Sequence, residues 1–288
     1  MLPFRRILLP VDYSEPCRAV VPYVHDMLRR FNAELTLVHA YGPAAAAILA
    51  GSQEQLVDPD FPEQVRAAEE ERLHLFAQHM FAGRHAELIA ELGEPGSVIH
   101  KIAEQQEADL VMLATHGYGP LRRFLLGSVT SKILHDATTP VWTGIGAALA
   151  DHAPDLPYRS ILVALSDTNE AEAVLRGAIA LARVYGANLS LVHMIQTPIV
   201  AHVDFHDYSQ ELTADAHARL RELMTRFDLD APASVIDGPV AEGVQNEVLR
   251  RRADLVITGR GHSQGAISKM WSHLYSIVRE CPSPVLSI

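Results

Sequence analysis

The sequence predicts an α/β protein made of two tandem open sheets, each with about five mostly parallel strands and helices on both faces. Short apolar, β-branched runs alternate along the chain with segments of helical periodicity, which is typical of parallel βαβ units. Four of these runs recur in the same order in the two halves of the 288-residue chain. Ordered internal repetition of this kind indicates a duplicated domain.

The repeated runs identify the segments that we expect to be strands. Each run is short, apolar and rich in β-branched residues, as buried strands of a parallel sheet are. The four pairs are Ile7–Glu15 with Ile161–Glu170, Asn32–Tyr41 with Gly186–Ile195, Glu107–Gly117 with Arg252–Gly261, and Thr138–Ile145 with Cys281–Ile288.

The segments between these runs show helical spacing of apolar residues. The buried faces expected for the first helix of each half are Val20, Val24, Met27, Leu28 and Phe31, and Val174, Leu175, Ile179, Ala182 and Val184. Further helices are expected over Glu63–Phe81, Val98–Gln106, Ser128–Asp136, Ser209–Phe227, Val240–Arg251 and His273–Arg279.

Residues 144–158 separate the two halves. Their sequence (GIGAALADHAPDLPY) is rich in Gly, Ala, Pro and Asp, and this composition is typical of a linker. We therefore expect one domain over residues 1–147 and a second over residues 158–288.

Charge and composition exclude several classes of protein. The chain has 24 Lys and Arg against 35 Asp and Glu, a net charge of −11, and general nucleic-acid binding requires a cationic surface. Its two cysteines, Cys17 and Cys281, cannot form a disulfide framework, which favours a reducing compartment. Pro10 and Asp12 interrupt the first apolar run, and no window approaches 18 uncharged apolar residues. We expect a soluble, cytoplasmic protein with neither a nucleic-acid partner nor a membrane partner.

Three strand ends of the first half predict the position of a ligand site. In an open parallel sheet, ligands bind in the crevice beyond the carboxyl ends of the strands. These ends are Pro10–Asp12, Val38–Ala40 and Leu113–Gly117.

A phosphate-binding helix start is expected to follow the last of these ends. Gly127 permits a close approach of the backbone, and Ser128 is expected to be the N-cap of the next helix. The free amides of Ser128, Val129 and Thr130, together with the helix dipole, can hold a phosphate group.

The segment Asp109–Val141 resembles the signature of the universal stress protein family. Nucleotide-binding members of that family have Gly, two residues, Gly, nine residues, and Gly followed by Ser or Thr. The corresponding residues here are Ala114, Gly117, Gly127 and Ser128. The first two strands also match the family, and the resemblance covers essentially the whole chain as two copies. It implies a Rossmann-like fold of the adenine nucleotide α-hydrolase-like type.

The resemblance implies that the first domain binds ATP, with or without Mg²⁺. Ala114 departs from the first glycine of the signature, and its methyl group is tolerable where the backbone does not require glycine. The implied ligand residues are Pro10, Val11 and Asp12 for the adenosine, Ala40 beside the base, Leu113, Ala114 and Gly117 along the nucleotide, and Gly127, Ser128, Val129 and Thr130 for the phosphates.

The second half departs further from the signature. Trp271-Ser272 stands where the first half has Gly127-Ser128, and an indole there should occupy the space that phosphates need. We expect no ATP in the same pose in the second domain. A differently built anion site is the alternative, using Gly259, Arg260, Gly261, His262 and His273.

These observations favour a nucleotide-responsive regulatory stress protein. One alternative is a structural or interaction protein of the same fold that binds no nucleotide. Another is a metal-binding stress protein that uses His202, Asp204 and His206, which are metal-compatible residues at close spacing. A nucleotide-dependent hydrolase or ligase is disfavoured because the sequence has neither a P-loop lysine nor a nucleophile elbow. Any ATP hydrolysis should be slow.

The last strand of each half is expected at an edge of its sheet, over Pro140–Thr143 and Pro284–Ser287. The resemblance implies that this strand mediates dimerisation. The two halves would then pair within one chain as a pseudo-dimer, which also protects the exposed edges, and a further homodimer stays open.

Overall fold

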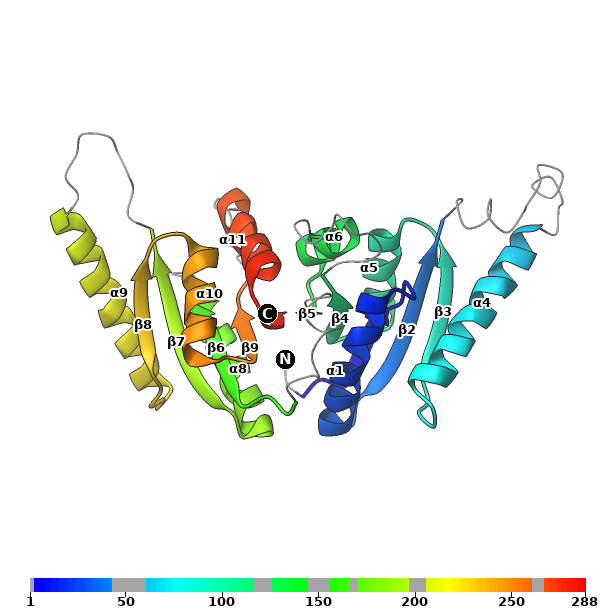
Figure 1. Cartoon of the computed structure of the whole chain (residues 1–288), viewed down its shortest axis with the longest axis horizontal. Helices are drawn as coiled ribbons and strands as arrows, with labels where there is room; N and C mark the ends of the chain where they lie inside the picture. Colours follow the sequence, from blue (N-terminus) through cyan, green and yellow to red (C-terminus); the bar gives the residue numbers. More distant parts are fainter. Residues whose placement is uncertain are drawn as a thin grey trace. The chain divides into compact units, whose positions relative to one another are not determined.

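A computed structural model of the chain describes residues 3–42, 61–115, 126–144, 156–165, 170–196, 206–260 and 267–288; for residues 206–209 and 267–272 it describes the backbone alone. The chain divides into two compact units, Pro3–Pro154 and Asp155–Ile288. Both units have the expected α/β fold with parallel strands (Figure 1).

The strands of the first unit stand in the order β3-β2-β1-β4-β5, and all described pairings are parallel. The elements of this unit are β1 (Arg6–Pro10), α1 (Glu15–Phe31), β2 (Glu34–Tyr41), α4 (Phe61–Met80), β3 (Glu87–Leu92), α5 (Pro95–Gln105), β4 (Leu110–Ala114), α6 (Ser128–Asp136) and β5 (Val141–Gly144).

The strands of the second unit stand in the order β10-β9-β6-β7-β8, again with parallel pairings. Its elements are β6 (Ser160–Leu165), α8 (Ala171–Tyr185), β7 (Asn188–Ile195), α9 (His206–Arg226), β8 (Ala233–Asp237), α10 (Val240–Arg251), β9 (Leu255–Thr258), α11 (Ile267–Glu280) and β10 (Val285–Ser287).

In the first unit, helices pack in pairs on the two faces of the sheet. α1 and α4 are neighbours, because the His25 ring nitrogen Nε2 lies 2.8 Å from the Met80 carbonyl oxygen. α5 packs against α6. Right-handed crossovers place the first pair on one face and the second pair on the other, so that the strands between them are buried on both sides.

The start and end of α1 follow from local sequence. The Ser14 hydroxyl accepts a hydrogen bond from the Cys17 N–H at 3.2 Å, and Glu15 follows in the first turn. Asn32 ends the helix in the left-handed region, with φ of 49°. These are favourable N-cap, dipole and C-cap residues, and they fix the helix directly after β1.

One carboxylate ties the strand starts together in each unit. Asp109 accepts hydrogen bonds from the backbone N–H groups of Arg5 (2.7 Å) and Arg6 (3.0 Å). In the second unit, Asp254 accepts the equivalent pair from the backbone N–H groups of Arg159 (2.7 Å) and Ser160 (3.1 Å), at the start of β6. The repeated Ala-Asp-Leu-Val sequence therefore aligns β4 with β1, and β9 with β6, in the same way.

The predicted helices are confirmed, with shifted ends. α6 and α10 have the expected bounds, whereas α11 begins six residues before the predicted start at His273. Val184 was predicted to be buried, but 42% of its surface is exposed. It lies at the margin of a buried face that is centred on Ala178 and Tyr185. Among the described helices, none is both long and apolar enough to span a bilayer.

We predict that Asp109→Ala destabilises the first unit by about 1–3 kcal/mol, because two backbone donors lose a charged acceptor. Trp142 is fully buried in this unit, so in a Trp271→Phe background its fluorescence follows the unfolding of this unit in urea. The control is Glu104→Ala, which removes an exposed carboxylate and should change stability by less than about 0.5 kcal/mol. Equal midpoints for the two variants would contradict the proposed role of Asp109.

Candidate functional site

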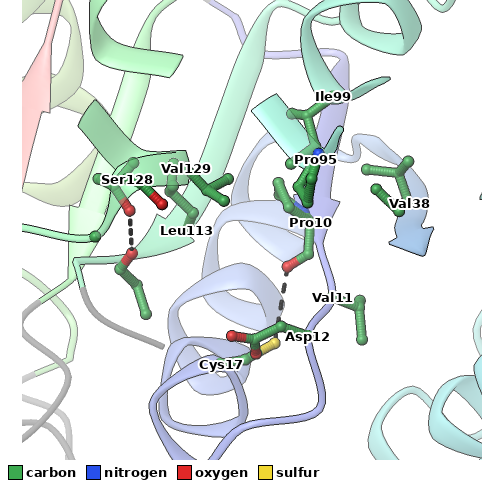
Figure 2. Close-up of a pocket in the computed structure, with 14 residues that line it drawn as sticks. Pro10, Val11, Asp12, Cys17, Val38, Pro95, Ile99, Leu113, Ser128 and Val129 are labelled. Carbon is green, nitrogen blue, oxygen red and sulfur yellow. Dashed lines mark hydrogen bonds between the residues drawn. The ribbon is translucent and has the colours of Figure 1, made fainter. Parts of the chain in front are cut away.

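A cavity of about 270 Å³ opens at the carboxyl ends of β1, β2 and β4 in the first unit (Figure 2). Small-molecule pockets occupy about 300–1,000 Å³, so this one is near the lower limit. The structure brings ten of the predicted site residues to its walls: Pro10, Val11, Asp12, Ala40, Leu113, Ala114, Gly127, Ser128, Val129 and Thr130. Gly117, the remaining predicted residue, lies outside the described residues.

Four further residues line the cavity; Val38 belongs to a predicted strand end, and the other three were not predicted for the site. Cys17 comes from the first turn of α1, Val38 from β2, and Pro95 and Ile99 from α5. The strand before α5 is not among the repeated runs, so its end was not recognised. Val38 begins the predicted strand end Val38–Ala40, and Cys17 lies in the first turn of the helix that follows Asp12, so their neighbours in the sequence are the signal that could have found them.

The two ends of the cavity differ in chemistry. Figure 2 shows Ser128 and Val129 at one side of the pocket and Val11 and Val38 at the other. The first end offers the start of a helix, and the second is apolar. A ligand with a flat apolar part and an anionic part would match both ends.

The start of α6 differs in one respect from the prediction. Gly127 is the N-cap, with φ of −59° and ψ of 144°, and Ser128 is the first helical residue. The prediction of Ser128 as N-cap was therefore wrong. No side chain caps this helix. Its first N–H groups have no acceptor within the helix, and Ser128, Val129 and Thr130 all lie at the cavity wall.

Neither Gly127 nor Ala114 has a backbone that requires glycine. A Cβ at Gly127 would lie 3.4 Å from the Thr115 carbonyl oxygen, an ordinary contact, and its φ is negative. Ala114 ends β4 with strand geometry and pairs with Gly144. The alanine in place of the family's first glycine therefore causes no strain, and the missing side chain at Gly127 leaves space at the helix start.

Thr130 fixes the helix start against the strand end. Its hydroxyl donates to the Ala114 carbonyl oxygen at 3.0 Å, and the Gly127 N–H donates to the Thr115 carbonyl at 3.0 Å. Two backbone carbonyls at the end of β4 are satisfied in this way. The amides that face the cavity are thus held in position before any ligand arrives.

Asp12 is the one carboxylate among the described residues of the cavity wall. Its Oδ1 accepts a hydrogen bond from the Ser14 N–H at 2.9 Å, and the side chain is exposed. The second carboxylate oxygen can accept a hydrogen bond from a ligand.

A buried contact between His39 and Glu69 lies behind the wall of the cavity. His39 Nδ1 lies 2.6 Å from the Val11 carbonyl oxygen, and its Nε2 lies 3.3 Å from Glu69 Oε2. His39 and Glu69 are both buried. Through its contact with the Val11 carbonyl, His39 positions the strand end that carries Asp12.

The second unit has a different arrangement at the corresponding place. Ser128 precedes the start of β5 by the same number of residues as Ser272 precedes the start of β10, so the two serines align. However, α6 begins at Ser128, whereas α11 begins before Ser272, at Ile267. The amides of Trp271 and Ser272 therefore lie inside a helix, where carbonyls of the preceding turn accept their hydrogen bonds. This backbone offers no helix start at the aligned position.

Arg260 follows β9 at the carboxyl edge of the second sheet, with 2% of its surface exposed. Burial lowers the pKa of its guanidinium to about 10, while the charge of Glu170 opposes the shift. A Cβ at Gly259 would lie 3.0 Å from Glu170 Oε2. Of the other residues of the alternative anion site, His273 lies in α11, and Gly261 and His262 fall outside the described residues.

The predicted metal residues are placed only in part. His202 and Asp204 lie outside the described residues, and His206 begins α9 with its backbone alone described. Within the described part of the chain, no three His, Cys, Asp or Glu side chains are grouped as a metal site requires.

Comparison with known proteins identifies the family. The model of the universal stress protein family matches residues 3–143 and again residues 157–288. The chain belongs to the universal stress protein family. It contains the family's domain twice, which accounts for the repeated strands.

Individual relatives match one half or the whole chain. A Staphylococcus haemolyticus protein described as a universal stress protein is 30% identical over 144 residues, covering 49% of this chain and 84% of its own. A universal stress protein of Methanocaldococcus jannaschii is 26% identical over 140 residues, covering 48% and 80%. The crystal structure of a universal stress protein from Archaeoglobus fulgidus covers 98% of this chain and 95% of its own, with a TM-score of 0.64 and 20% identity. That structure shares the fold of the tandem protein.

We predict that Cys17 reacts very slowly with iodoacetamide at pH 8. Burial, followed by the nearby charge of Asp12, raises the pKa of this thiol from 9.0 to about 12. The thiolate is the reacting form, and its fraction falls about a thousandfold for a shift of this size. Mass spectrometry of a Cys281→Ala chain measures the rate, with the same chain unfolded in urea as control. Similar rates in the folded and unfolded chains would refute the raised pKa.

Proposed function

We propose that the first domain of this universal stress protein binds ATP and that the chain acts as a nucleotide-responsive regulatory protein. The observation that carries this proposal is the cavity that joins an uncapped helix start, at Gly127, to an apolar pocket beside β1 and β2. A nucleotide has the matching parts, since its base is flat and its phosphates are anionic. We propose functional domains over residues 1–147 and 158–288, as the sequence predicts.

The base would lie at the apolar end and the phosphates at the helix start. Val11, Val38 and Ala40 would surround the base, and Asp12 would accept a hydrogen bond from the nucleoside. Leu113, Ala114 and Gly117 would run along the nucleotide, and Gly127, Ser128, Val129 and Thr130 would hold the phosphates.

Backbone amides reconcile phosphate binding with an acidic chain. The net charge is −11, yet the amides of Ser128–Thr130 and the helix dipole act at short range on a group in direct contact. Bound Mg²⁺ would neutralise part of the phosphate charge. The wall itself offers a single carboxylate, Asp12, within the described residues, which supports binding over rapid hydrolysis.

The second domain is proposed to hold no ATP in this pose. Support comes from the position of Trp271 and Ser272 inside α11, because amides within a helix are not free to bind phosphate. Pairing of the two domains as an intramolecular pseudo-dimer stays a prediction.

We predict that ATP with Mg²⁺ binds at about one site per chain and that Gly127→Trp abolishes binding. The indole would fill the space beside the helix start, while the negative φ of Gly127 accepts a side chain. Isothermal calorimetry measures the stoichiometry and the affinity. As a matched control, Glu104→Trp places the same indole on an exposed position of α5 and should bind ATP like the wild type.

The results separate the proposed function from its alternatives. No heat from the wild-type chain would favour the interaction protein that binds no nucleotide. Two sites per chain would contradict the proposal for the second domain. ADP production that persists in Gly127→Trp would come from somewhere other than this cavity.

We predict that Asp12→Asn weakens ATP binding about tenfold, since a neutral amide is the poorer acceptor for a nucleoside hydroxyl or amine. Asparagine retains an oxygen that can accept from the Ser14 N–H, so the turn should persist. Competition calorimetry compares this variant with Glu15→Gln, which removes an exposed charge nearby. Tighter binding by Asp12→Asn would place the carboxylate beside the phosphates and reverse the proposed orientation.

A further inference from the structure

A second cavity of the first unit lies between α1 and α4 and does not share its lining with the nucleotide pocket. Its volume is about 260 Å³, and it is lined by Tyr13, Arg18, Arg72, Leu75, Phe76 and His79. Four of these residues recur at helical spacing along one face of α4, at positions 72, 75, 76 and 79. One wall of the cavity is therefore one face of α4, and the other is formed by residues at the start of α1.

The walls of this cavity carry positive charge and no carboxylate. Arg72 stacks on the Tyr13 ring, with 4.0 Å from its Cζ to the ring centroid, and Arg18 lies 5.5 Å from the centre of the Phe76 ring. Among the described residues, Arg18 forms no ion pair with a carboxylate. Arg72 has one distant partner, Glu69, at 3.8 Å, and that carboxylate also faces His39. Several guanidinium N–H groups are therefore available to a ligand.

Tyr13 supplies the observation that points to a ligand. Only 7% of its surface is exposed, and its hydroxyl is buried without a hydrogen-bond partner among the described residues. A buried hydroxyl in this state is costly. The Tyr13 backbone also has φ of 62°, a left-handed conformation that is unfavourable for a large side chain. Burial, strain and an unsatisfied donor coincide at one residue of the cavity wall.

We propose that this cavity binds a small phosphate monoester, with the phosphate on Arg18 and Arg72 and the organic part against Leu75 and Phe76. Arginine binds phosphate oxygens with paired N–H donors. The Tyr13 hydroxyl donates to the same group and so gains the partner it lacks.

The second cavity has its own lining but is adjacent to the nucleotide pocket. Tyr13 lies between Asp12, at the wall of that pocket, and Ser14, whose N–H donates to Asp12. Occupation of the second cavity would hold this three-residue turn in its observed conformation. The centroids of the Tyr13 and His39 rings lie 4.6 Å apart, and His39 in turn contacts the Val11 carbonyl oxygen.

Calorimetry with phenyl phosphate on the full chain tests the proposal. A Gly127→Trp background keeps the probe out of the nucleotide pocket, so failure here is distinct from failure of ATP binding. We expect about one site per chain. Arg72→Gln and Arg18→Gln should each weaken binding about tenfold or more, and Tyr13→Phe should weaken it several-fold. Arg66→Gln, an exposed arginine of the same helix that pairs with Glu63, should leave binding unchanged.

The outcomes decide the proposal in each case. Absence of heat with phenyl phosphate, or an equal loss in Arg66→Gln, would overturn it. Benzoate that binds as tightly as phenyl phosphate would overturn the phosphate assignment and indicate a carboxylate ligand. Inorganic phosphate is expected to bind more weakly than phenyl phosphate, because it makes no contact with Leu75 or Phe76; equal affinity would remove the role of the apolar wall. Near-ultraviolet circular dichroism confirms that each variant retains its packing.

Discussion

From β1 the chain passes through α1 towards β2 and β3, and it returns through α5 to β4 on the other side of β1. This reversal of strand order sends the connections after β1 and β4 to opposite faces of the sheet. The carboxyl ends of the two strands are left uncovered between them, as open α/β sheets require. The proposed nucleotide pocket depends on that single topological constraint, because its walls come from elements that diverge there.

Hydrogen bonds to backbone carbonyl groups hold the walls of this crevice in position. The hydroxyl of Thr130 and the amide of Gly127 bind the carbonyls at the end of β4, and His39 supports Val11. These contacts leave the amides at the start of α6 free. The proposed phosphate site therefore consists of backbone amides, with no cationic side chain among its described lining residues, and this is compatible with an acidic chain.

Much of the fold could be predicted because the chain presents it twice. Repeated runs located four strands of each domain, and helical periodicity located the helices. β3 and β8 were not located, since their residues are half-buried or exposed at the sheet edges and lack a continuous apolar run. Pro95 and Ile99 were consequently missed, because they belong to the helix that follows β3.

Helix starts were the least predictable part of the site. Ser128 has a favourable N-cap side chain, but the extended backbone of Gly127 takes the cap position. α11 already includes the residues from Ile267 to Ser272, before the predicted start at His273. Local propensity does not distinguish these cases. The difference bears on the proposed function, since α6 presents its first amides to a cavity and α11 has its aligned amides within the helix.

Asp109 and Asp254 stabilise the two domains at a place that is distant from the proposed ligand site. They align the strand starts in the same way in both domains. These starts are the amino ends of the strands, opposite the carboxyl ends where the crevice lies. Residues at the carboxyl ends of the strands in one copy could therefore change without the loss of these hydrogen bonds. In a tandem chain of this design, the residues at the ligand end of one domain can differ from those of the other while both domains keep the same alignment of their strands.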